Sequence, residues 1–95
     1  MVQIIASELR DKEVITNQGT ILGNIFDLSA DEDTGKIEYL IIDPYSADIA
    51  NELSSDDEGH ALVPASTIVA VRDDVVVDGK KLSASLTRAR QRQER

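Results

Sequence analysis

The stretch Thr20–Asp43, TILGNIFDLSADEDTGKIEYLIID, contains the clearest strand signals in the chain. Its first part alternates apolar residues with polar or mixed ones, which predicts a half-buried strand with a bend at Gly23. A turn follows over residues 31–36, where Gly35 supplies backbone freedom. The two apolar runs around a short turn predict a hairpin from about Thr20 to Ile42, and Pro44 ends it.

The second strand of this hairpin, KIEYLIID, presents two different faces. Side chains alternate across a strand, so Ile37, Tyr39 and Ile41 share one face. Leu40 and Ile42 share the other face, which begins polar at its first position and then becomes apolar. Such a face is typical of a strand that runs from a rim into a closed interior, so we assign Leu40 and Ile42 to the core.

The rest of the chain consists of short β-branched runs separated by Gly, Asp and Pro turns. Residues 13–16, 61–64, 66–72 and 75–77 are strand-like. Residues 45–60 read as a charged loop insertion, in which Ile49 and Leu53 have the spacing of one helical turn. The pattern predicts an all-β fold, a small barrel of about six strands with a short helical turn or loop insertion and a C-terminal tail. The predicted core is Val14, Ile21, Ile25, Leu40, Ile42, Leu62, Val69, Val71 and Val76.

The 95 residues allow one small domain, and charge divides the chain unequally. Residues 1–79, the predicted barrel domain, carry seventeen acidic and four basic residues, a net charge of −13. Residues 80–95, a basic tail that is either helical or disordered, carry one acidic and six basic residues, net +5. The domain repels phosphates and anionic lipids, so nucleic acid is not the expected partner of the domain.

Composition also bears on the environment of the protein. Eleven of the acidic residues are Asp and only four of the basic residues are Lys, a balance that favours a halophilic protein in a saline cytoplasm, with an ordinary acidic protein as the alternative. No apolar run reaches the length of a membrane span, so we expect a cytoplasmic location without membrane insertion. The chain has no Cys, which excludes disulfides and thiolate sites.

No catalytic or metal site is expected from the sequence. The single histidine, His60, sits in a polar stretch and is interpreted as an exposed loop residue. The acidic run Asp31–Asp33 has its glycine one residue too early for a calcium-binding EF-hand loop. No phosphate-binding glycine motif or nucleophile elbow occurs. We therefore expect no enzyme, no cofactor and no metal.

The tail contains a second feature, the arginines Arg88, Arg90, Arg92 and Arg95. Their side chains are able to bind a few phosphates, an acidic partner protein, or the acidic domain of a second copy of this chain. Because no aromatic residues are interleaved with them, a protein partner is favoured over nucleic acid. A solubilising tail without a partner is the plainer alternative.

The order of motifs from Ser7 to Val77 resembles the PRC-barrel domain, a family named after the photosynthetic reaction centre H subunit. The matching segments are Ser7-x-Leu9-x-x-Lys12-x-Val14, Gly19-x-x-Leu22-Gly23-x-Ile25-x-Asp27-Leu28, Asp33-Thr-Gly-Lys-Ile37, Tyr39-Leu-Ile-Ile, Leu62-Val-Pro64, Ile68-x-Ala-Val71 and Asp74-Val-Val-Val77. The resemblance covers about seventy residues of the chain. It implies a small barrel without enzymatic activity.

The resemblance also implies a function. Small stand-alone archaeal PRC-barrel proteins act in cell division with SepF, the anchor of FtsZ, often as homodimers or with a paralogous barrel. For this chain it implies a protein–protein adaptor concentrated at the division site, with SepF or a second PRC barrel as partner and FtsZ engaged indirectly. By analogy with the ribosome-maturation factor RimM, the alternative is an RNA- or ribosome-associated factor that uses the arginine tail.

If the protein is an adaptor, its interface is expected on outward apolar residues, with Ile37, Tyr39 and Ile41 as the candidates. Tyr is enriched in interface cores, and a barrel this small cannot bury both faces of its longest strand. The alternative is that the segment 45–60 covers these residues within the same chain.

Overall fold

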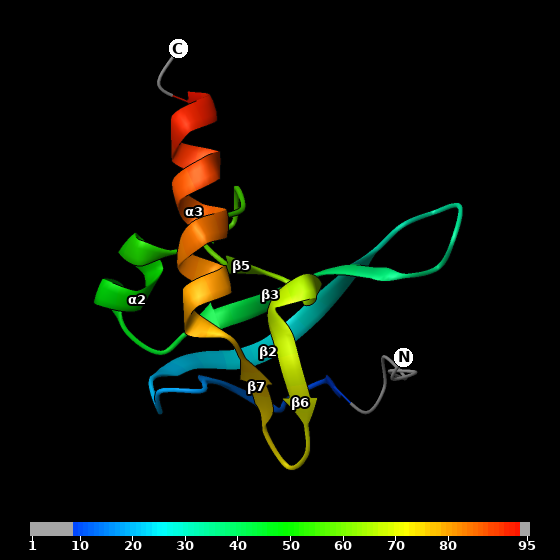
Figure 1. The fold of residues 1–95 in the computed structure, drawn as a ribbon. Helices are drawn as coiled ribbons and strands as arrows, with labels where there is room; N and C mark the ends of the chain where they lie inside the picture. Colours follow the sequence, from blue (N-terminus) through cyan, green and yellow to red (C-terminus); the bar gives the residue numbers. More distant parts are fainter. Residues whose placement is uncertain (1–8, 94–95) are drawn as a thin grey trace.

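The computed structural model describes residues 9–93 and contains one mixed β-sheet of seven strands (Figure 1). In chain order the elements are β1 (Glu13–Thr16), β2 (Ile21–Ala30), β3 (Ile37–Pro44), α2 (Ala47–Glu52), β4 (Ser54–Ser55), β5 (Ala61–Pro64), the 3₁₀ turn η1 (Ala65–Thr67), β6 (Ile68–Val71), β7 (Val75–Val77) and α3 (Gly79–Gln93). The strand order in the sheet is β4-β5-β3-β2-β1-β7-β6.

The predicted hairpin is confirmed as β2 and β3, which pair antiparallel. At one end of the ladder Gly23 is opposite Pro44, and at the other end Ala30 is opposite Ile37. β5 pairs antiparallel with β3 on its other side, and β1 pairs parallel with β7. Gly23 is essential to this pairing because its φ is +154° and its hydrogens face the Asp43 carbonyl. The glycine at the predicted bend therefore permits a close approach between two strands.

The expected closed barrel is not what the described residues form. β4 and β6, at the two ends of the strand order, are not paired with each other in the described part of the chain. β5 and β6 stand near opposite ends of that order, yet only η1 joins them, and η1 packs against β3. Three connecting residues span a short distance, so the sheet curls until its ends approach at η1 without forming a ladder there.

The core lies on the inner face of this curled sheet. Its buried apolar residues are Leu9, Val14, Leu22, Ile25, Leu40, Ile42, Leu53, Ala61, Val63, Val75, Val77 and Leu82. Val14, Ile25, Leu40 and Ile42 were predicted. Leu62 and Val76 are instead half-buried and Val69 is 52% exposed, so those core assignments were wrong. Ile21 is also half-buried and is not part of the core cluster, whereas Val71 is half-buried and packs against the core.

The segment 45–60 is more ordered than the predicted loop insertion. Ser46 caps α2 by accepting a hydrogen bond from the Ile49 backbone N–H at 3.2 Å. Leu53 is buried and Ile49 packs against the core, so the predicted helical spacing of these two residues has a structural role. Ser54 and Ser55 then form the edge strand β4 on β5.

The basic tail begins as the helix α3. Asp78 caps it, because its carboxylate accepts hydrogen bonds from the backbone N–H groups of Lys80 and Lys81 at 2.9 and 3.1 Å. Leu82 is buried in the core and Leu86 packs against it. Figure 1 shows that α3 rises from the end of β7 past β5 and that its C-terminal part extends beyond the sheet.

Candidate interaction surface

The outer face of β3 continues across β5 to β4. In the ladders, Tyr39 is paired with Pro64, and Ile41 is paired with Leu62, which is paired in turn with Ser54. Residues directly opposite one another share a face, so these side chains form one surface on the side of the sheet away from the core. We call it the outer patch: Tyr39, Ile41, Ser54, Leu62 and Pro64.

The three predicted interface residues do not all belong to the outer patch. Tyr39 is 39% exposed and Ile41 is half-buried, and both lie in the patch. Ile37 packs partly against the core. A register irregularity between Ser29 and Ala30 interrupts the alternation beside Ile37. The sequence pattern does not reveal such a bulge.

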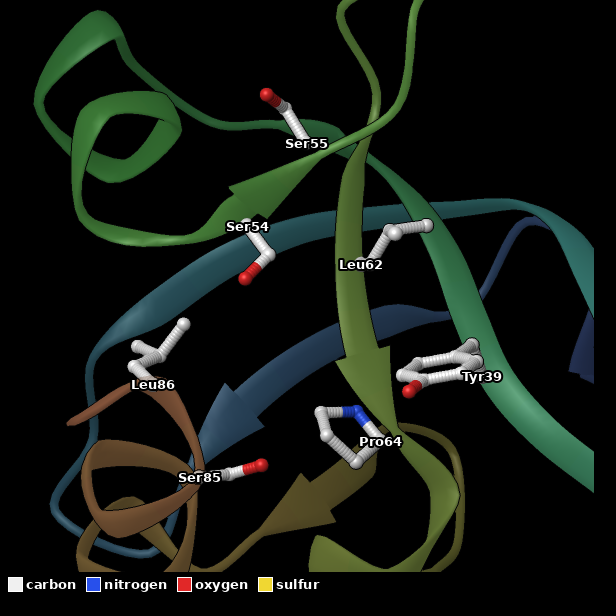
Figure 2. A pocket seen from close by; sticks show the side chains of 7 residues that line it. All are labelled: Tyr39, Ser54, Ser55, Leu62, Pro64, Ser85 and Leu86. Atoms are coloured by element: carbon white, nitrogen blue, oxygen red, sulfur yellow. The ribbon is translucent and has the colours of Figure 1, made fainter. Parts of the chain in front are cut away.

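A groove of about 300 Å³ lies where the outer patch meets α3 (Figure 2). Every patch residue except Ile41 lines the groove, together with Ser55, Ser85 and Leu86. Figure 2 shows Ser85 and Leu86 on the helix across from Ser54 on β4, with Tyr39 beside Pro64 on the strand side. The groove therefore combines an aromatic ring and aliphatic groups with the hydroxyls of Ser54 and Ser85, whereas the Ser55 hydroxyl points away from it. This volume is at the lower end of the range for small-molecule sites, so it admits side chains more readily than a whole ligand.

The alternative cover for the patch, the segment 45–60, extends it instead. Its β4 residues line the groove, and both are exposed. Tyr45 in the same segment is itself exposed. The sequence missed the contribution of Leu62 and Pro64, because the pairing of β5 with β3 decides which of its residues face outward.

A second group of side chains surrounds His60, and here the sequence interpretation was wrong. The His60 side chain is 15% exposed rather than lying free in a loop. Its ring stacks on Phe26 with 4.2 Å between the ring centroids and 14° between the planes. Its Nε2 is 3.4 Å from Asp43 Oδ1, and its Nδ1 is 3.3 Å from Asp56 Oδ2. The proximity of Phe26, thirty-four residues earlier, is not readable from the sequence.

The Asp56 carboxylate organises the turn before His60. It accepts hydrogen bonds from the backbone N–H groups of Glu58 and His60, each at 2.9 Å. Desolvation of this carboxylate raises its pKa, but these two hydrogen bonds and the charge of His60 together outweigh it, so the pKa of Asp56 lies below its ordinary value. The Asp56 carboxylate therefore stabilises the turn before His60, and the His60 ring contacts Phe26 of β2 and lies near Asp43 of β3.

Two further features were looked for among residues 9–93, a group of metal ligands and a membrane-spanning helix. Among the described residues, no three or more His, Asp or Glu side chains are grouped so that they could hold a metal ion. Residues 9–93 also include no helix with the length and apolarity that crossing a bilayer requires. Arg88, Arg90 and Arg92 belong to the C-terminal half of α3, whereas Arg95 and the Ser7 of the family pattern lie outside the described residues.

Comparison with known proteins now gives the family context. Residues 1–83 match the PRC-barrel domain. The chain is also similar to an uncharacterised protein of Methanocaldococcus jannaschii, with 26% identity over 83 residues, covering 87% of this chain and 90% of that protein. The match to the PRC-barrel domain includes every strand of the sheet and the first turn of α3.

Proposed function

Because this chain belongs to the PRC-barrel domain family, we propose that it is a non-enzymatic protein–protein adaptor of the archaeal FtsZ- and SepF-based cell-division machinery. The partners are SepF or a second PRC-barrel protein, FtsZ is engaged indirectly, and the adaptor acts as a homodimer. It works in a saline cytoplasm, concentrated at the division site. The division role rests on the resemblance to small archaeal PRC-barrel proteins.

The observation that carries the adaptor role is the outer patch with its groove. Tyr39 keeps 39% of its surface exposed beside Ile41, Leu62 and Pro64, and the groove opens next to it. An aromatic residue in an apolar setting with a polar rim is the usual anchor of a protein interface. A partner that covers this face would exclude water from apolar side chains that the chain itself leaves accessible.

The test is affinity purification of the tagged protein from its native cells at their natural salt concentration, followed by mass spectrometry. We expect SepF, FtsZ or a second PRC-barrel protein to be recovered. Recovery should fall at least tenfold for the Tyr39→Ala and Leu62→Ser double variant. The matched control is Val69→Ser, which changes an exposed apolar residue on the edge strand β6 and should leave recovery unchanged.

Two results would overturn this proposal. The first is recovery of ribosomal proteins and RNA that is lost when Arg88, Arg90 and Arg92 are replaced, which would support the RNA-associated alternative. The second is equal recovery of division proteins by the natural chain and the outer-patch variant, which would remove this face from the interface.

A further inference from the structure

Charge is distributed unevenly around the groove. Residues 37–71, which supply its strand side, contain seven acidic residues and no Lys or Arg. Three of the acidic residues, Asp48, Glu52 and Asp57, are exposed on α2 and beside β4. α2 packs against both β3 and β4, so this acidic group lies on the same edge of the sheet as the groove. We call these three residues the acidic rim.

The opposite charge is at the far end of the same chain. Residues 87–95, TRARQRQER, carry four Arg and one Glu, a net charge of +3. Leu82 and Leu86 pack on the core, whereas the helix continues to Gln93 beyond the sheet (Figure 1). A continuous helix advances about 1.5 Å per residue in one direction, so the backbone of residues 87–93 continues along α3 and does not fold back across the sheet.

The groove offers what an arginine side chain needs. The Tyr39 ring provides a face on which a guanidinium group can stack, and the hydroxyls of Ser54 and Ser85 can accept its hydrogen bonds. The acidic rim supplies the opposite charge. The aliphatic part of the side chain would contact Leu62 and Pro64.

We propose that the arginine segment 87–95 of a second copy docks on the groove and acidic rim of this chain. Reciprocal docking of the two segments closes a two-fold dimer, the commonest symmetry of soluble oligomers. This inference deepens the proposed adaptor function by naming the contact within its homodimer, and it rests on that function for the interaction role of the face. The choice of a second copy as the occupant rests on charge complementarity and on the direction of α3 as far as Gln93.

The experiment measures self-association of the purified full-length chain by analytical ultracentrifugation at about 0.1 M salt, where the Debye length is about 10 Å. The tail variant carries Arg88→Glu, Arg90→Glu and Arg92→Glu. The rim variant carries Asp48→Lys, Glu52→Lys and Asp57→Lys. The control, with the same charge change as the rim variant, carries Glu32→Lys, Asp33→Lys and Asp73→Lys in exposed turns elsewhere on the sheet.

We expect the natural chain and the control to dimerise. The tail and rim variants should each dimerise at least about tenfold more weakly, because each of the two equivalent contacts loses up to three exposed ion pairs. A chain carrying both sets of changes restores opposite charges across the contact, and its affinity should return to within about threefold of the natural value. Circular dichroism would establish that each variant is folded.

A natural chain that remains monomeric, a rim variant that behaves like the control, or a doubly changed chain that is not rescued would each overturn the inference. These results are separable from the proposed function. A monomeric chain that still captures SepF or a second PRC barrel refutes the docking alone. A rescued dimer that captures no division protein refutes the adaptor role and leaves the docking intact.

Discussion

The two faces of β3 are built from similar residues and have different surroundings. On the inner face Leu40 and Ile42 have no solvent exposure and pack in the core. On the outer face Tyr39 and Ile41 are one position away, yet they retain accessible surface beside a groove. Composition alone does not distinguish the faces. The curl of the sheet does, because it encloses one face and leaves the other available for a partner.

The largest predicted effect comes from breaking the strand pairing on which this comparison depends. Gly23→Ala places a Cβ against the Asp43 carbonyl at a φ that side chains rarely adopt, so β2 and β3 must separate. We expect a loss of about 3 kcal/mol or more in the free energy of unfolding, measured by urea denaturation.

The matched control for that variant is Gly59→Ala. Gly59 also has a positive φ, +89°, but nothing lies within 4 Å of an added Cβ. Its cost should be about 1 kcal/mol, from backbone strain alone. Equal losses at the two glycines would mean that the close approach of β2 and β3 is unimportant.

The comparison of the faces is tested directly by truncating one residue on each. Leu40→Ala should cost about 3 kcal/mol because it leaves a cavity in the core. Tyr39→Ala should cost less than about 1 kcal/mol, since much of that side chain already contacts water. Thermal unfolding provides the readout, at about 4–8 °C per kcal/mol for a domain of this size. Equal shifts would place Tyr39 in the core.

A smaller effect is expected at Phe26, which tests whether an exposed side chain always contributes little to the stability of the fold. Phe26 is 51% exposed, yet its ring stacks on His60, so Phe26→Ala should destabilise the fold by about 1 kcal/mol. Val69 is similarly exposed at 52%, and Val69→Ala is the control with an expected change below about 0.5 kcal/mol. Matching changes in urea denaturation would show that the stacking contributes nothing.

The smallest predicted effect is the loss of the stabilising contribution of Asp56 at acid pH. The pKa of Asp56 is lowered in the folded chain, so its contribution to stability is present above the ordinary aspartate value of about 4 and is lost as the pH falls through the lowered value. Asp56→Asn keeps an oxygen acceptor and removes the charge. The difference in melting temperature between this variant and the natural chain should therefore shrink from pH 6 to pH 2. A difference that stays constant with pH would contradict the assignment, and Glu32→Gln on an exposed turn is the control.

The hairpin was predictable because local signals agree there: Ile25, Leu40 and Ile42 alternate as a buried face requires, and Gly35 marks the turn. The later strands were harder to predict. In Val75–Val77 and Ala61–Pro64 every position is apolar or small, so a shift of one residue exchanges the faces without changing the pattern. Only pairing with a neighbouring strand makes Val63 inner and Leu62 outer.

The interaction surface was predicted in part for the same reason. Tyr39 and Ile41 were found from the strand alternation. Ile37 was not separated from them, because the irregular register leaves an extra residue, Glu38, between Ile37 and Tyr39 on β3 itself. β4 consists of two serines, a residue type that does not favour strands, so this strand can be recognised only from its pairing with β5. His60 looks like a loop residue in the sequence because the ring that covers it comes from β2.

The parallel pairing of β1 with β7 has a consequence for how the chain folds during synthesis. Val14 is the ladder partner of Val75, so the central part of the sheet needs residues at both ends of the domain. The β2–β3 hairpin can form as soon as it leaves the ribosome, because its contacts are local. β1 can pair with β2 early, but its pairing with β7 must wait until β7 has emerged. Closing so long a loop carries an entropic cost before the contact between β1 and β7 is gained. Until then the new chain exposes an open strand edge beside an apolar face, which makes this interval the period of greatest risk of aggregation.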